Sequence, residues 1–487
     1  MIETQVSIHD NFSVEFKTGF RTDNKKEAVN QFRINTWIFL PNSIDINRST
    51  YSKNQFYRDV KKNIRLITPI YSLEDILKTG RGPLPRFQKA IDQLLLDPSS
   101  ERASENYTYQ VKMLLCIVKS ALRREVSIIK VISDEKEIEQ VVEHFIENIK
   151  SIAIQYREKR RDIEAVEATD KQKEYFMFGD DFLSNITEQY TFQVMQALKG
   201  KRVFERLKPK LDSLLEYEIG YRKSRDYLLL EEGNKEQNSL VISQRNILKK
   251  FVESDLFLQT TKKKDGAFVE QFYYSIAAGI AMIFATVISF FATQRYGNFT
   301  TDLFIVLVVS YMMKDRIKEI ARYYFSSVLS KRYFDTKTKL GIRNQEIGWL
   351  KESFDFVEEK KVPDEIMSLR NRTPLVEAEN EIYNEQVILY RKWLSLSREE
   401  IEKYKEYHLS GINDITRFSL INYIQKMDNP SIPINIFDKE NGYKTIAGTK
   451  VYLLYYILQC QSDTDTHYKK YRVLFNRDGI ISVSELD

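Results

Sequence analysis

The sequence is poor in the residues that most often carry chemistry, with 16 glycines, four histidines and two cysteines among 487 residues. Scarce glycine disfavours the loops that cradle phosphate groups. Cys116 and Cys460 each lack a neighbouring cysteine. This argues against a zinc knuckle or a disulfide framework and suits a reducing compartment.

Catalytic motifs are also missing. The sequence has no His-Glu-x-x-His, Walker A, Gly-x-Ser-x-Gly or Gly-x-Gly-x-x-Gly pattern. The adjacent carboxylates Asp180 and Asp181 precede an apolar helical pattern, so we expect them to cap that helix rather than to bind a metal. No catalytic residue, metal site or cofactor is predicted, and the leading interpretation is a protein without enzymatic activity.

Neither a strong charge nor a targeting signal is found. The 74 Lys and Arg residues against 69 Asp and Glu residues give a formal net charge of +5, which makes no case for a nucleic-acid groove. The first 30 residues contain no apolar signal-peptide core, and Ile2 stands where myristoylation needs a glycine. An internal segment is therefore the only anchor that we predict.

That segment is an uncharged stretch of 24 residues, Gln271 to Gln294. At 1.5 Å per residue, a helix of this length crosses a bilayer core of about 30 Å. The stretch predicts a membrane-spanning helix. The alternative is one arm of a buried helical hairpin in a soluble protein.

A second apolar run, Leu303 to Met313, is shorter. Only 11 residues separate Asp302 from Lys314. Counted from Asn298 the run has 16 residues, which just crosses a bilayer if Lys314 reaches back to the interface. We expect the two runs to form a transmembrane hairpin with spans at about 271–294 and 298–313. Partial insertion of the second run remains an alternative.

Basic residues flank the two runs on the side away from the connecting loop. They are Lys262, Lys263, Lys264, Lys314, Arg316, Lys318 and Arg322. The loop Arg295–Thr301 carries one basic residue. Because cytoplasmic flanks are enriched in Lys and Arg, we predict a bacterial inner-membrane protein with both termini in the cytoplasm.

Small residues recur every four positions in the first run. The stripe consists of Ala277, Ala281, Ala285, Ser289 and Thr293. Small side chains allow helices to approach closely in lipid, so this stripe predicts a packing seam. Its partner is either the second run of the same chain or a copy in another subunit, which makes a homo-oligomer an expectation.

The rest of the chain predicts a mixed fold, mainly α, with small β elements at both ends and a helical cytoplasmic region joined to the two-helix transmembrane hairpin. Alternating apolar residues predict strands near Phe12–Phe16 and Gln31–Leu40, and an antiparallel meander after Val451. Because a hairpin returns the chain to the face that it left, the two ends could meet in one body. The expected domains are 1–84 (α/β), 85–265 (helical), 266–335 (hairpin with helical extension), 336–408 (helical) and 409–487 (antiparallel β).

These features favour a membrane-anchored cytoplasmic sensor or effector of a bacterium, which could serve stress or defence. The soluble part would bind a ligand or a protein partner, and the hairpin would oligomerise or perturb the membrane. Two alternatives stay open: a passive membrane-tethered scaffold, and a membrane-bound enzyme whose site is assembled from distant residues. The predicted partners are the lipid bilayer, further copies of the chain and a protein, with no nucleic acid.

Overall fold

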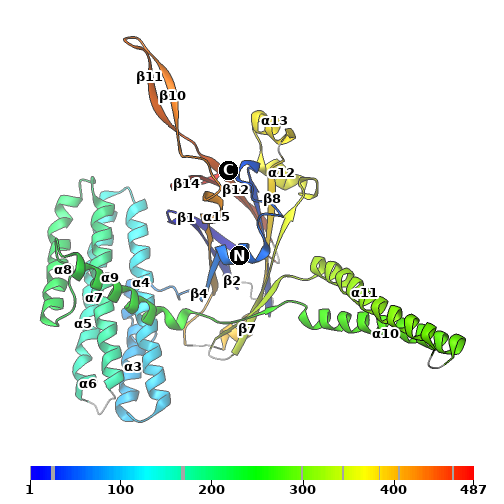
Figure 1. Ribbon diagram of the computed structural model, residues 1–487. Helices are drawn as coiled ribbons and strands as arrows, with labels where there is room; N and C mark the ends of the chain where they lie inside the picture. Colours follow the sequence, from blue (N-terminus) through cyan, green and yellow to red (C-terminus); the bar gives the residue numbers. More distant parts are fainter. Residues whose placement is uncertain are drawn as a thin grey trace. The chain divides into compact units, whose positions relative to one another are not determined.

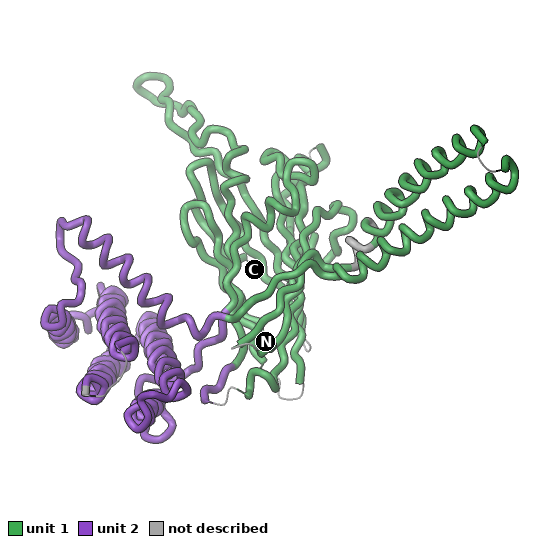
Figure 2. Tube along the Cα trace, turned by 60° about the horizontal axis from the view of Figure 1, so that its bottom comes forward, with its two compact units in different colours: residues 1–64, 258–405, 410–487 green, residues 65–257, 406–409 purple. Residues whose placement is uncertain are grey.

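The computed structural model describes residues 2–22, 28–165, 170–297, 300–342, 345–382, 384–403, 406–462 and 465–486. The chain forms two compact units, coloured separately in Figure 2. Unit 1 comprises residues 1–64, 258–405 and 410–487, and unit 2 comprises residues 65–257 and 406–409.

Unit 2 is helical (Figure 1). Its elements are α2 (Leu73–Leu77), α3 (Pro83–Leu96), α4 (Glu101–Val131), α5 (Glu135–Glu158), α6 (Arg160–Ala165), α7 (Asp170–Leu198), α8 (Phe204–Ser224), α9 (Lys235–Glu253) and the short η2 (Ser254–Leu256). Side chains of Ser100, Asp134 and Asn234 cap α4, α5 and α9 by accepting backbone N–H bonds. The helices α4 to α9 lie within the region 85–265 that the sequence predicts to be helical, but residues 259–264 of that region form a strand of unit 1.

The core of unit 2 follows from apolar residues at helical spacing. Val111, Leu114, Leu115 and Val118 are all buried on α4. Tyr156 stacks between two phenylalanines, with its ring centroid 4.9 Å from that of Phe87 and 4.7 Å from that of Phe176. These contacts join α3, α5 and α7.

A network of buried charges replaces part of that apolar core. Asp180 accepts bonds from Arg157 Nε at 3.1 Å and Arg160 Nη2 at 2.6 Å, and Glu218 accepts two bonds from Arg157 at 3.1 and 2.7 Å. Asp181 accepts a bond from Gln244 at 2.7 Å. Because α7 begins at Asp170, Asp180 and Asp181 lie inside the helix rather than at its start. The capping role predicted from sequence is therefore wrong.

Unit 1 is built on two antiparallel sheets. The larger has eight strands in the order β14-β13-β12-β3-β8-β7-β6-β5, and the smaller has the order β1-β2-β9-β4. The strands of the larger sheet are β3 (Val29–Leu40), β5 (Gln259–Lys264), β6 (Thr336–Ile342), β7 (Gln345–Val357), β8 (Gln386–Ser397), β12 (Tyr452–Ser462), β13 (Thr466–Asn476) and β14 (Gly479–Leu486). Those of the smaller sheet are β1 (Ile2–Asp10), β2 (Ser13–Arg21), β4 (Val60–Leu66) and β9 (Gly411–Ser419).

The remaining elements of unit 1 are short apart from its two long helices. They are η1 (Asn42–Ile44), α1 (Lys53–Asp59), η3 (Glu359–Lys361), α12 (Asp364–Arg370), α13 (Pro374–Ile382), α14 (Arg398–Glu402) and α15 (Ile421–Ile424). A two-stranded ribbon, β10 (Ser431–Asp438) with β11 (Gly442–Thr449), is also present. The long helices, α10 (Ala267–Tyr296) and α11 (Thr301–Arg332), lie between β5 and β6.

The two ends of the chain meet in unit 1, as the sequence predicts. β3 pairs with β12, for example Trp37 opposite Ile457, and β2 pairs with β9. The predicted C-terminal meander is also confirmed, because β12, β13 and β14 pair antiparallel in order. Alternating burial explains the pairing, since Phe32, Ile34 and Ile38 of β3 face the interior.

The predicted fold class is wrong in two respects. The β structure forms an eight-stranded sheet rather than small elements at the ends. The segment 336–408, expected to be helical, supplies β8, β7 and β6, which lie side by side between β3 and the edge strand β5 of this sheet. Charged pairs in the middle of these strands, Lys351-Glu352 and Arg391-Lys392, interrupt the apolar alternation and imitate an amphipathic helix. The second error is the two-helix transmembrane hairpin, because among the described helices only α10 is long and apolar enough to cross a membrane.

Some of those central charges are buried and paired. Lys392 on β8 donates to Asp414 and, at 2.6 Å, to Thr416 Oγ1, both on β9. Lys62 on β4 donates to Glu352 on β7, which also accepts a bond from the Tyr390 hydroxyl. These contacts join the two sheets, since each pair has one member in each sheet.

The chain leaves and re-enters unit 1 at one point. Leu258 donates a backbone hydrogen bond to the carbonyl of Ile64 at 3.2 Å, and the whole of residues 65–257 lies between them in sequence. The two long helices are inserted in the same way, because β5 before them pairs with β6 after them. Unit 1 thus carries two insertions, a helical unit and a helical hairpin.

Candidate membrane-contacting hairpin

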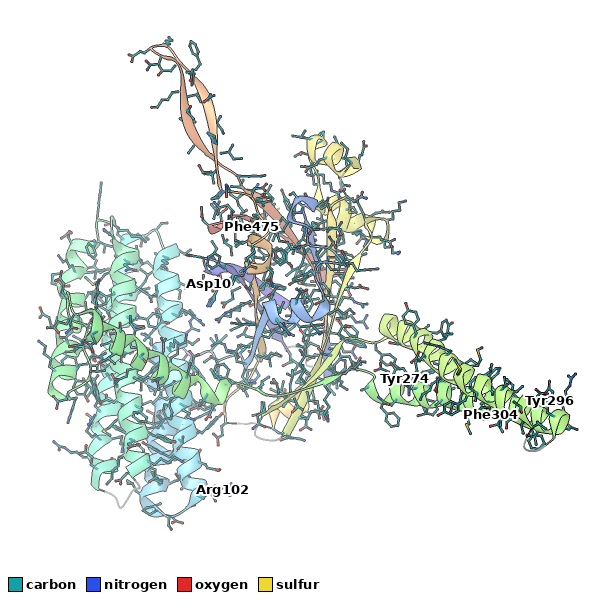
Figure 3. All side chains as sticks on the ribbon, viewed as in Figure 1. Asp10, Arg102, Tyr274, Tyr296, Phe304 and Phe475 are labelled. Atoms are coloured by element: carbon teal, nitrogen blue, oxygen red, sulfur yellow. The ribbon has the colours of Figure 1, made fainter. Side chains whose placement is uncertain are left out.

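The candidate site is the antiparallel hairpin of α10 and α11, which projects from the β5–β6 edge of unit 1 (Figure 3). Tyr274 lies near its base, and Tyr296 and Phe304 lie near its tip. Within the described residues, α10 is the one helix long and apolar enough to cross a membrane, judged by length and composition. Only 17% of its apolar window is buried in the structure, whereas a core helix of a soluble protein is mostly buried.

A two-helix transmembrane hairpin, as predicted, is contradicted by α11. This helix is 32 residues long, but it does not qualify as a span within the described residues. Its apolar part, from Leu303 to Met313, is about 16 Å long and is followed directly by Lys314, Asp315 and Arg316. Asn298, where the second span was expected to start, lies outside the described residues.

The predicted small-residue seam lies partly in the α10–α11 interface. Ala277 and Ala281 are fully buried, Ala285 and Ser289 are half-buried, and Thr293 is exposed. A step of four residues turns by about 400° around a helix with 3.6 residues per turn, so a stripe at this spacing drifts away from a fixed partner. Ala292, one residue earlier than Thr293, is buried instead. Self-association through the seam stays a prediction.

Contacts along the hairpin fix which residues lie side by side. Ser310 Oγ lies 3.5 Å from the carbonyl oxygen of Ala285, and the rings of Tyr273 and Phe325 have centroids 5.1 Å apart. The distal half therefore pairs residues 283–296 of α10 with residues 301–313 of α11. The proximal half pairs residues 272–282 with residues 314–326.

The distal half presents apolar side chains to solvent on both helices. The exposed fraction is 78% for Phe290, 68% for Phe291 and 67% for Phe304. Further exposed members are Ile283, Val287, Ile305, Leu307, Val308, Val309, Tyr311, Met312 and Met313. An apolar surface of this extent marks a protein or membrane contact.

The predicted basic residues lie at the base and along the proximal half. Lys262, Lys263 and Lys264 are exposed on β5, and Lys314, Arg316, Lys318 and Arg322 are on α11. Several are held by local contacts. Lys264 pairs with Glu270, Arg316 Nη1 lies 3.4 Å from Glu319 Oε2, and Lys314 Nζ lies 3.7 Å from the Tyr311 ring centroid. The proximal half of α11 thus carries basic residues, interspersed with the exposed Ile320, Tyr323 and Tyr324.

A cavity of about 760 Å³ in unit 1 is the obvious place to look for an enzyme site. Its carboxylates are largely engaged. Glu359 and Glu385 accept bonds from Arg372, and the bond from Arg372 lowers the pKa of Glu359. Within the described residues, no group of three or more His, Cys, Asp or Glu side chains could hold a metal ion. Among the described residues that line this cavity, no nucleophile lies beside an activating base.

No family model, no curated protein and no solved structure matches this chain. A function can therefore be argued only from the residues and their geometry.

Proposed function

We propose that the protein is a membrane-attached sensor or effector that contacts a bilayer through the distal half of the α10–α11 hairpin. The observation that supports this is the exposure of large apolar side chains on both helices of that half. Burying one such side chain contributes about 1.5–3 kcal/mol, so a dozen of them supply ample driving force for insertion.

The depth of insertion follows from the charges. The apolar part shared by both helices is about 16 Å deep, roughly half of a bilayer core. If α10 crossed fully, Lys314, Asp315 and Arg316 of α11 would lie beside the middle of the core. If only the distal half enters, Arg295 and Asp302 are the deep charges. At about 2.5–3.5 kcal/mol each, two deep charges cost less than three or more. We therefore propose partial insertion, with the basic residues of α11 among the lipid headgroups.

The location of the ends supports the proposed orientation. Both β1 and β14 belong to unit 1, so both ends of the described chain lie on the same side of any membrane that the hairpin enters. The basic residues on β5 and α11 favour the cytoplasmic face of a bacterial inner membrane. Since β5 and β6 continue directly into the two helices, a shift of the hairpin would displace these two strands at the edge of the eight-stranded sheet. This coupling supports a sensor or effector over a passive anchor.

Flotation with lipid vesicles tests the attachment. The full chain should float with vesicles that contain anionic lipid, and the double variant Phe291→Glu, Phe304→Glu should stay at the bottom of the gradient, because two carboxylates then line the inserted surface. Phe268→Glu is the matched control. Phe268 is 85% exposed but lies at the base, so this variant should float like the parent.

If the parent chain does not float, or if all three proteins float equally, the proposed attachment is wrong. Release of a trapped dye by the parent, and not by the double variant, would support a membrane-perturbing effector. Tight binding without dye release would support the scaffold instead.

A further inference from the structure

Unit 2 contains a cavity of about 240 Å³ whose lining is rich in cations. Arg65, Lys119, Arg123 and Lys249 line it, and Glu253 is the one carboxylate among the lining residues. The hydroxyl-bearing residues Ser120 and Thr68 complete its polar wall.

Two helices build most of the cavity through residues four positions apart. Lys119 and Arg123 are neighbours on one face of α4, and Lys249 and Glu253 are neighbours on one face of α9. Packing of α4 against α9 brings the two faces together. The Sγ of Cys116, a lining residue on α4, lies 3.3 Å from the Val252 carbonyl oxygen on α9.

The charges around the cavity are not balanced. Glu253 pairs with two of the four cations, Lys119 Nζ at 2.6 Å and Arg65 Nη1 at 3.3 Å. Within the described part of the chain, Arg123 and Lys249 form no ion pair. Counting formal charges, the wall carries four positive charges against one negative charge. Like charges that converge on a small volume repel one another, and an anion in the cavity relieves that repulsion.

We propose that this cavity binds a small anion with two or more negative charges, of the phosphate-bearing class. Guanidinium groups, ammonium groups and hydroxyls are the side chains that recognise phosphate oxygens. A volume of about 240 Å³ accepts one or two phosphate groups with a small substituent, and is below the 300–1,000 Å³ typical of sites for larger ligands. A nucleic-acid strand does not fit, since the cations surround a cavity and do not form a stripe.

The inference deepens the proposed function, because it names a ligand for the soluble part of the sensor. Binding of the anion does not need a membrane. The flotation experiment and the binding experiment can therefore fail separately, and each failure identifies which proposal is wrong.

Calorimetric titration of the full chain in detergent with inorganic pyrophosphate tests the cavity. The parent should bind one pyrophosphate saturably at constant ionic strength. The double variant Arg123→Gln, Lys249→Gln should bind at least about tenfold more weakly, because it removes two of the four cations that line the cavity. Lys130→Gln, Lys250→Gln is the matched control, since it removes the same charge from exposed residues of the same two helices that, unlike the exposed Arg123 and Lys249, do not line the cavity. It should bind like the parent.

A third variant should raise the affinity for pyrophosphate. Glu253→Gln frees Arg65 and Lys119 from their carboxylate and should tighten pyrophosphate binding several-fold. The proposal is overturned if the parent shows no saturable binding, or if the cavity variant and the control variant weaken binding equally. It is also overturned if Glu253→Gln, folded by circular dichroism, binds more weakly than the parent.

Discussion

The two units of this protein bury charge in different ways. In unit 2, the helical unit, one arginine serves several acceptors, since Arg157 contacts both Asp180 and Glu218. In unit 1, the β unit, the two sheets are joined by single lysines, as in Lys392 with Asp414, although Arg372 elsewhere in this unit also serves both Glu359 and Glu385. Arginine presents a planar fork that can serve two carboxylates from different helices, whereas lysine acts as a point charge suited to a single neighbour.

The difference also affects protonation. Burial lowers the pKa of Lys62, against the opposing effect of Glu352. An arginine stays protonated at any pH at which the protein is folded. The arginine network around Asp180 and Glu218 in the helical unit therefore keeps its positive charge as the pH rises. Burial lowers the pKa of Lys119 in that unit as it does that of Lys62 in the β unit, so these two lysines release their protons below the pH at which a free lysine does.

Each unit carries its own reporter of stability. Cys116 lies on α4 in the helical unit and Cys460 on β12 in the β unit, and both are buried. Burial raises the pKa of the Cys460 thiol to about 11 and that of the Cys116 thiol further. At pH 8 each thiol reacts only when its surroundings open, so labelling of each cysteine, read by mass spectrometry, measures the opening of its own unit.

The largest effect is expected from Arg157→Met. This change leaves Asp180 and Glu218 buried with fewer donors, which costs about 3–5 kcal/mol. Labelling of Cys116 should accelerate by about a hundredfold or more, and labelling of Cys460 should not change. Arg161→Met, at an exposed position on α6, is the control and should leave both rates unchanged.

A smaller effect is expected from Lys392→Met in the β unit. Asp414 loses its cation but still accepts a bond from the Thr416 hydroxyl at 3.1 Å, so the cost should be about 2–3 kcal/mol. Here Cys460 should label faster while Cys116 keeps its rate. Lys439→Met, in the exposed turn between β10 and β11, serves as the control. Equal acceleration of both cysteines by either core substitution would mean that the two units open together, and the comparison would fail.

The smallest effect on stability is expected from Arg157→Lys, which tests the geometry of the hydrogen bonds separately from the charge. Arg157→Lys keeps the positive charge but cannot make the two parallel bonds to Glu218, so about 1–2 kcal/mol should be lost. Cys116 labelling should then rise roughly tenfold. A rate equal to that of the parent would show that charge alone holds the network, and that the fork of arginine is not needed.

Sequence patterns predicted the ends of the β unit and the helices of the helical unit, because Phe32, Ile34 and Val111 follow clean periods of two and 3.6 residues. They failed where buried charge breaks the pattern. Glu352 and Lys392 made central strands resemble a helix, and Asp180 resembled a cap although it is a buried acceptor.

The candidate sites were predictable to different degrees. The apolar run of α10 is evident from composition, but its register against α11, and hence the short depth of the shared apolar surface, requires the contact between Ala285 and Ser310. The cationic cavity was missed. Its only local signal is the four-residue spacing of Lys119 with Arg123 and of Lys249 with Glu253, and nothing in the sequence brings those two helices together.

The pairing of β3 with β12 affects the order in which parts of the chain fold during synthesis. During synthesis, β12 leaves the ribosome long after α10. The eight-stranded sheet therefore cannot be completed until well after α10 has emerged. At 5–20 residues per second the interval is on the order of ten seconds. The helical unit, whose contacts lie within residues 65–257 and 406–409, is nearly complete by then. The apolar hairpin thus becomes accessible to a membrane before the body that carries it has folded.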